Sequence, residues 1–207
     1  MMKTQSQETQ KNLTPELAYS ILKEGNLRFV NNLKANRNLL EQVNETSNGQ
    51  FPFATILSCM DSRTSAELIF DQGLGDIFSI RIAGNVLNDD VLGSMEFGTK
   101  VVGTKIILVL GHTGCGAIVG ACNAVKMGKL TQLLNKIKPA IDQEVQTEVD
   151  RTGSNSQFVE RVTTNNIKMV MEQIKNESPI IAELEAQKQL KIVGGLYDVK
   201  SGEVTFY

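Results

Sequence analysis

The stretch KIILVLGHTGCG, residues 105–116, decides the fold of this chain. Its first half, residues 105–110, is a short apolar run, typical of a strand that is buried on both faces of a parallel sheet. Gly111, Gly114 and Gly116 then allow a tight backbone turn, and a helix is expected from residue 114 to about 127. A buried strand, a glycine turn and a helix together indicate an α/β fold.

The same alternation continues on both sides of this stretch. Strands are predicted over residues 53–59, 77–82, 190–197 and 203–207, and helices over residues 14–33, 64–72, 89–102, 130–149 and 156–175. Strands that alternate with helices predict a central, mostly parallel sheet of about four or five strands that is flanked by helices. Residues 1–13 are expected to form a disordered tail, residues 34–50 a loop, and residues 14–207 a single domain.

Composition excludes several classes of function. The chain has 207 residues, with 21 basic and 23 acidic side chains, and no concentrated basic face for nucleic acid. Its apolar runs are too short to cross a membrane, and its polar N-terminus lacks a signal sequence. A cytoplasmic protein is expected, unless a leader peptide has been removed. Three cysteines are too few for a disulfide framework, so we expect core residues, nucleophiles or metal ligands.

Unusual residues follow two of the predicted strands. CMDSR begins at Cys59, and His112 and Cys115 follow the strand quoted above; His112 is the only histidine in the chain. Because the carboxyl ends of parallel strands meet at one edge of a sheet, we expect these three side chains to converge. Two sulfurs and one imidazole nitrogen suit zinc, and a site with only three protein ligands is typical of catalytic zinc.

Asp61 and Arg63 are two residues apart, so in an extended segment their side chains lie on the same side and can form a bidentate ion pair. Two states of Asp61 follow. While paired with Arg63, Asp61 can accept a hydrogen bond from zinc-bound water and leaves the metal open. When released, it can become the fourth ligand and close the site.

Each signal alone has a simpler explanation. Cys122 is expected to be a small core residue, an isolated Asp-x-Arg is usually a surface ion pair, and a glycine-rich turn alone suggests phosphate binding. The turn lacks the lysine of the Walker pattern, and the absence of CxxC argues against a redox protein. The zinc interpretation becomes specific only because CMDSR follows one strand and the His112–Cys115 motif follows another, in this order.

The combination resembles the β-class carbonic anhydrases. The resemblance rests on residues 59–63, on RIAGN at residues 81–85 and on GHTGCG at residues 111–116, and it extends over residues 14–207. It implies reversible hydration of carbon dioxide to bicarbonate and a proton. Cys59, His112 and Cys115 would bind one zinc ion, and the Asp61–Arg63 pair would orient a zinc-bound hydroxide.

The resemblance also implies a substrate pocket and an assembly. Gln50, Phe78, Ala83, Phe97 and Gly116 fall on pocket positions, although Phe97 stands where other members carry tyrosine. Members of the family form homodimers, often homotetramers, and we expect the N-terminal helical arm to pack on a partner subunit. Two alternatives remain: a related zinc hydrolase acting on carbon disulfide or carbonyl sulfide, and a non-catalytic zinc-binding descendant.

Overall fold

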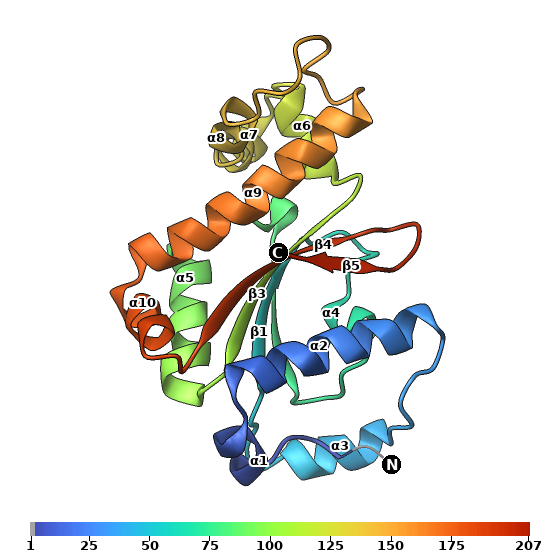
Figure 1. The fold of residues 1–207 in the computed structure, drawn as a ribbon, viewed down its shortest axis with the longest axis vertical. Coiled ribbons are helices and arrows are strands. Elements are labelled where there is room, and N and C mark those ends of the chain that lie inside the picture. The colour runs from blue at the N-terminus through green and yellow to red at the C-terminus, as the bar shows by residue number, and fades with distance from the viewer. Residues whose placement is uncertain (1–2) are drawn as a thin grey trace.

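A computed structural model describes residues 3–207 and contains one five-stranded sheet (Figure 1). The strand order is β2-β1-β3-β4-β5, and all pairs are parallel except β4 with β5. The strands are β1 (Ala54–Ser58), β2 (Ile77–Arg81), β3 (Ile106–His112), β4 (Lys191–Tyr197) and β5 (Val204–Phe206). The predicted α/β class and mostly parallel sheet are confirmed.

The central strands carry the core on both faces, because every residue of β1 and β3 is buried. Side chains of successive residues point to opposite faces. Ile56 and Leu108 pack on one face against α2 (Pro15–Val30) and α4 (Ala66–Ile69). On the other face, Leu57 and Val109 pack against α5 (Asp89–Glu96), α9 (Ser156–Glu177) and α10 (Pro179–Ala186), which Figure 1 shows on the side away from α2.

Helix α2 begins as the sequence predicts. The Thr14 side chain accepts a hydrogen bond from the Leu17 N–H, and Pro15 occupies the first turn. The helix buries Ala18 and Leu22 and leaves Leu17 exposed. Helix α2 thus covers the sheet of its own chain.

The N-terminal region contains two helices that the sequence analysis missed. Helix α1 (Gln7–Asn12) lies within the expected disordered tail and is stabilised by a capping box between Ser6 and Thr9. Residues 1 and 2 of that tail lie outside the described residues. Helix α3 (Leu39–Thr46), capped by Asn38, lies within the expected loop. The polar composition of both segments concealed their local capping signals.

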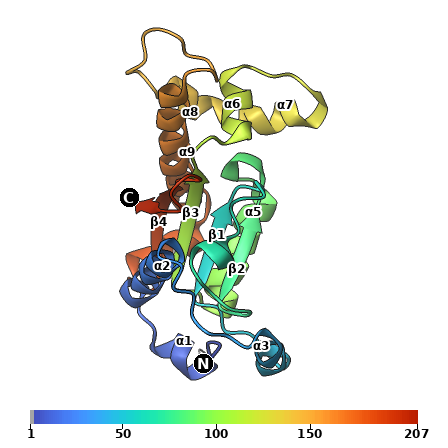
Figure 2. The same cartoon turned by 90° about the vertical axis from the view of Figure 1, so that its right-hand side faces the viewer.

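A third group of helices packs beyond the carboxyl edge of the sheet (Figure 2). Helix α6 (Gly116–Cys122) is shorter than predicted, and the single helix predicted over residues 130–149 is instead α7 (Gly128–Asn135) and α8 (Lys138–Asp142). Pro139 accounts for the break, because it has no N–H to donate to the carbonyl oxygen four residues earlier and is tolerated only in the first turn of a helix, where α8 places it. Helix α10, which starts at Pro179 after the Ser178 cap, was not predicted.

Two short helices are not α-helices. The turn after β2 is the 3-10 helix η1 (Ala83–Asn85), and the predicted helix over residues 89–102 continues from α5 into the π-helix η2 (Phe97–Val102). No helix within residues 3–207 is long and apolar enough to cross a membrane.

Candidate metal centre

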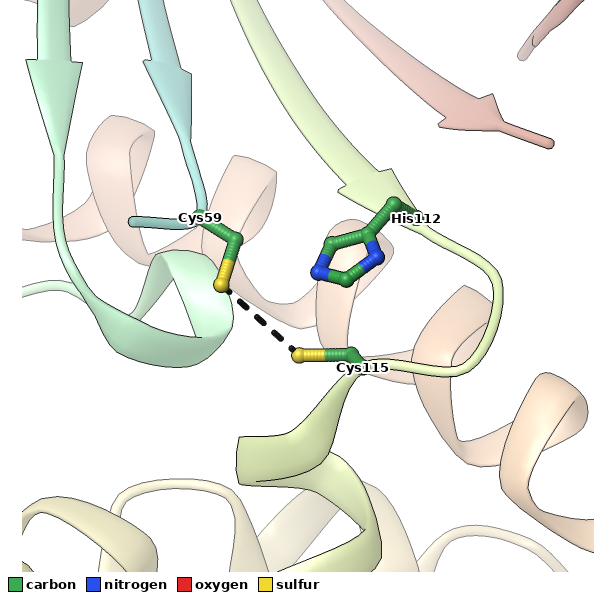
Figure 3. Close-up of side chains that lie close together, drawn as sticks. All are labelled: Cys59, His112 and Cys115. Carbon is green, nitrogen blue, oxygen red and sulfur yellow. Dashed lines mark hydrogen bonds between the residues drawn. The ribbon is translucent and has the colours of Figure 1, made fainter. Parts of the chain in front are cut away.

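Two segments that are far apart in the sequence meet at the carboxyl edge of the sheet. Cys59 directly follows β1, His112 ends β3, and Cys115 precedes α6. Their side chains point toward one another (Figure 3), and one ligand atom from each lies within 4.8 Å of the other two. All three residues are buried. The parallel register of β1 and β3, which pairs Ser58 with Leu110, produces this convergence.

The geometry of the cluster fits a tetrahedral zinc ion. The two sulfurs are 3.9 Å apart. Two sulfurs bound at about 2.3 Å in tetrahedral geometry would be about 3.8 Å apart, whereas a disulfide bond is about 2.05 Å long. The His112 Nδ1 lies 3.0 Å from the Thr113 carbonyl oxygen, so Nδ1 carries the proton and Nε2 presents its lone pair. Nε2 is buried and has no hydrogen-bond partner among the described residues, as expected of a ligand atom.

The two cysteines are electrostatically unequal. The pKa of Cys59 is lowered to about 4, first by a hydrogen bond with Cys115 and further by His112 and the Gly84 N–H, against the effect of burial. The pKa of Cys115 is raised by its interaction with Cys59 and by burial. The two thiols are thus coupled, and loss of the proton from one disfavours its loss from the other. A divalent cation would displace the thiol protons and bind both thiolates.

Asp61 is held beside the cluster by Arg63. The Arg63 guanidinium donates from Nε to Oδ1 at 2.9 Å and from Nη2 to Oδ2 at 2.8 Å, and the Arg63 N–H donates to Oδ1 at 3.0 Å. These bonds hold the pKa of Asp61 well below its usual range. Oδ2 lies 3.9 Å from His112 Nε2. Asp61 is therefore an ionised hydrogen-bond acceptor that lies next to the ligand atoms and is restrained by Arg63.

The structure divides the predicted pocket residues into two groups. Ala83 and Gly116 lie at the cluster, because Ala83 precedes the glycine that contacts Cys59 and Gly116 follows Cys115. The exposed Gln50 precedes β1, at the end of the strand opposite to Cys59. Phe78 pairs with Thr55 near that same end, and its ring packs against Phe97 with centroids 6.3 Å apart. One chain thus does not bring Gln50, Phe78 and Phe97 to its own metal cluster.

Two residues that support the site were missed. Arg81 donates from Nε to the Cys59 carbonyl oxygen at 3.2 Å and from Nη2 to the Asp61 carbonyl oxygen at 2.6 Å. The buried Thr64 hydroxyl lies 2.9 Å from the same two oxygens. Both side chains fix the backbone between the candidate ligand Cys59 and Asp61. A signal was present, since Arg81 opens RIAGN and Thr64 directly follows CMDSR.

Comparison with known proteins agrees with this geometry. The family model described as carbonic anhydrase matches residues 54–204. The chain is 35% identical over 199 residues to "Carbonic anhydrase 2" of Mycobacterium tuberculosis, covering 92% of each chain. It is 32% identical to the carbonic anhydrase of Mycolicibacterium smegmatis, covering 93% of each.

A solved structure extends the agreement to the fold. The β-carbonic anhydrase CafA of Aspergillus fumigatus superposes with a TM-score of 0.74 at 25% identity, over 81% of each chain. The matched region includes Cys59, Asp61, Arg63, His112 and Cys115. The sequence motifs, the converging thiols and imidazole, and these matches lead to one conclusion: the chain belongs to the β-carbonic anhydrase family of enzymes.

Proposed function

We propose that this protein catalyses the reversible hydration of carbon dioxide to bicarbonate and a proton, on one zinc ion held by Cys59, His112 and Cys115. The observation that carries the proposal is the convergence of these three ligand atoms within 4.8 Å, beside a restrained carboxylate. When bound, zinc supplies the Lewis acidity that makes water nucleophilic near neutral pH.

The cluster residues set the charge of the site. Two thiolates and a neutral imidazole cancel the double charge of zinc, and three protein ligands leave a fourth position for substrate chemistry. Arg63 holds Asp61 through two hydrogen bonds and thereby restrains it from becoming a fourth ligand. Asp61 Oδ2, 3.9 Å from His112 Nε2, is then placed to accept a hydrogen bond from the reacting water and orient it.

The backbone beside Cys115 supplies the complementary donor. Gly116 begins α6, so its N–H belongs to the first turn and makes no intrahelical hydrogen bond. We assign this N–H to an oxygen of bicarbonate, and the Ala83 methyl group to the apolar wall that receives carbon dioxide. The chain has no second histidine, so the product proton leaves through solvent and buffer.

The remaining pocket residues support a homodimer. Gln50, Phe78 and Phe97 lie away from the cluster of their own chain, yet Phe97 is exposed and packs against Phe78. We propose that they complete the pocket of a second copy, so that each site needs two subunits. Exposed apolar residues that a partner would cover lie on α2, α3 and η2: Leu17, Leu27, Leu39, Leu40, Val43 and Val101.

We also propose a cytoplasmic location. Cys59, Cys115 and Cys122 are all free, and Cys59 and Cys115 act as metal ligands only while they remain reduced. A reducing compartment maintains that state.

The test is stopped-flow carbon dioxide hydration together with zinc content, for the wild type and Asp61→Asn. We expect about one zinc per chain in both proteins, and a loss of hydration of about 100-fold or more in the variant, because the neutral amide has a single acceptor oxygen and cannot keep the bidentate pair with Arg63 while it accepts from the reacting water. Carbonyl sulfide and carbon disulfide are assayed in parallel. Zinc-loaded wild type that hydrolyses either of them but does not hydrate carbon dioxide would contradict the proposed substrate.

A further inference from the structure

The turn at Ile82–Asn85 lies between the metal cluster and the long helix α9 and makes hydrogen bonds to both. The Ile82 N–H donates to the Ser58 carbonyl oxygen at 3.1 Å, and the Asn85 N–H donates to the Ile82 carbonyl oxygen at 2.9 Å. Between them, the Gly84 N–H donates to the sulfur of Cys59 at 3.4 Å. This turn therefore supplies a backbone hydrogen bond to one of the proposed ligand atoms.

Two consecutive residues of the turn adopt left-handed backbone conformations. Gly84 has φ +66°, and a Cβ atom there would lie 3.0 Å from Ile137 Cδ1 and 3.2 Å from Ala117 Cβ. The next residue, Asn85, is buried and also left-handed, with φ +42°. Left-handed conformations are unfavourable for residues other than glycine, and they persist where surrounding structure holds them. The direction of the Gly84 N–H thus depends on contacts from outside the turn.

Asn166 of α9 makes such a contact. Its Nδ2 donates to the Gly84 carbonyl oxygen at 3.0 Å, and the residue is fully buried. Its neighbours along the buried face of α9, Val162 and Val170, are apolar. Its Oδ1 is buried and accepts no hydrogen bond from the described residues. A buried oxygen without a hydrogen-bond partner is unfavourable, so a leucine would be the more favourable residue here if packing alone mattered. We therefore attribute the presence of Asn166 to its donor group.

We propose that Asn166 is a positioning residue of the metal centre: it holds the Gly84 carbonyl so that the Gly84 N–H points at the Cys59 sulfur and stabilises the thiolate as a ligand. The proposal rests on the metal site proposed above. Groups that hydrogen-bond to ligands orient them, and removing one typically weakens metal affinity by about 10–100-fold. Asn166 touches neither metal nor substrate and acts only through Gly84.

The neighbouring Asn165 provides a matched control. It lies on the same helix, and its Nδ2 donates to the Ala140 carbonyl oxygen at 3.3 Å, away from the turn. Zinc affinity is measured by competition with a chelator, at a temperature where circular dichroism shows each protein folded. We expect Asn166→Leu to bind zinc at least about tenfold more weakly and Asn165→Leu to stay within about twofold of wild type. Equal affinities, or equal losses in both variants, would overturn the role of Asn166.

A second readout follows the hydrogen bond itself. In protein loaded with cadmium-113, the Gly84 amide proton is expected to couple to the metal through the Cys59 sulfur, and Asn166→Leu should lose this coupling while Asn165→Leu keeps it. If Asn166→Leu does not fold, Asn166→Asp, which keeps the size but removes the donor group, replaces it, and absence of the coupling in wild type refutes the role of Asn166 in any case, because Gly84 then makes no hydrogen bond to Cys59. Wild type that binds neither zinc nor cadmium contradicts the metal site itself, whereas normal wild-type binding with an unaffected Asn166→Leu contradicts only the positioning role.

Discussion

Arg63 holds Asp61 through two parallel hydrogen bonds, Nε to Oδ1 at 2.9 Å and Nη2 to Oδ2 at 2.8 Å. The Asp61 carboxylate is therefore fixed in direction and stays ionised, and it lies 3.9 Å from His112 Nε2. A single amino group could retain the charge interaction but not this planar, two-point geometry.

Arg63→Lys should therefore impair catalysis without removing the metal. We expect hydration to fall by about 10–100-fold, since a small loss of orientation in a site has effects of this size. Stopped-flow assays at equal zinc content provide the measurement. Arg161→Lys is the control, because Arg161 pairs with Glu144 and none of its hydrogen bonds reaches the cluster. Full activity in Arg63→Lys would show that charge alone suffices.

The cluster thiols should be masked by metal and released by chelation. Zinc-loaded protein should react slowly with a thiol reagent at pH 7, and chelation should expose two further thiols. Of these, Cys59 should react first, because its pKa is lowered to about 4. Cys122 should react little in either state, since burial raises its pKa to about 11. Counting thiols in Cys122→Ala removes its contribution. Thiols that react equally before and after chelation would argue against metal ligation.

Asp71 should make stability dependent on pH. The carboxylate is buried and accepts hydrogen bonds from Arg28 and Arg37, both at 2.6 Å. Burial raises the pKa of Asp71, but Arg28, the Ala35 N–H and Arg37 outweigh burial, and the pKa in the folded state is lowered. A depressed folded-state pKa contributes stability above the unfolded value, near 3.9, and this contribution is lost as pH falls further toward the folded-state value.

Asp71→Asn should reduce the free energy of unfolding at pH 7 by about 3 kcal/mol, because it disrupts a buried ion pair. The difference from wild type should shrink as pH falls below about 4. Urea unfolding of metal-free protein at several pH values measures both effects. Asp142→Asn, at an exposed aspartate, should differ little from wild type throughout. A difference for Asp71→Asn that does not change with pH would refute the electrostatic explanation.

The apolar surface of α3 should contribute to self-association. Leu40 and Val43 are 78% and 50% exposed and lie three residues apart, on one face of the helix. Replacing both with glutamate should shift the protein from a dimer or tetramer toward monomer in analytical ultracentrifugation, with loss of activity because each pocket would be incomplete. The matched control replaces Val145 and Val149, both 81% exposed, with glutamate. A fully active monomer would contradict the shared pocket.

Sequence patterns predicted the strands and the convergence of Cys59, His112 and Cys115 well, for a physical reason. A strand buried on both faces must be continuously apolar, as β3 is, and the residues that follow such strands must meet at one edge. Helix α3 was missed because it is only eight residues long, its apolar residues Leu39, Leu40 and Val43 lie at the surface rather than in the core, and its start depends on the Asn38 side-chain cap.

Other features depended on tertiary packing and could not be predicted. Nothing local to Asn166 reveals that its amide reaches the Gly84 carbonyl, 82 residues away in sequence. Likewise, Leu17 and Leu22 of α2 are equally apolar, and only the position of the sheet decides that Leu22 is buried and Leu17 exposed. The division of the pocket residues between two ends of β1 required the strand register.

The most direct test of the central claim is zinc K-edge X-ray absorption of the metal-loaded protein. We predict about one zinc per chain, with two sulfur atoms at about 2.3 Å and two lighter atoms, one of them an imidazole nitrogen, at about 2.0–2.1 Å. A spectrum without sulfur in the coordination shell, or a chain that takes up no zinc while folded and reduced, would contradict the account.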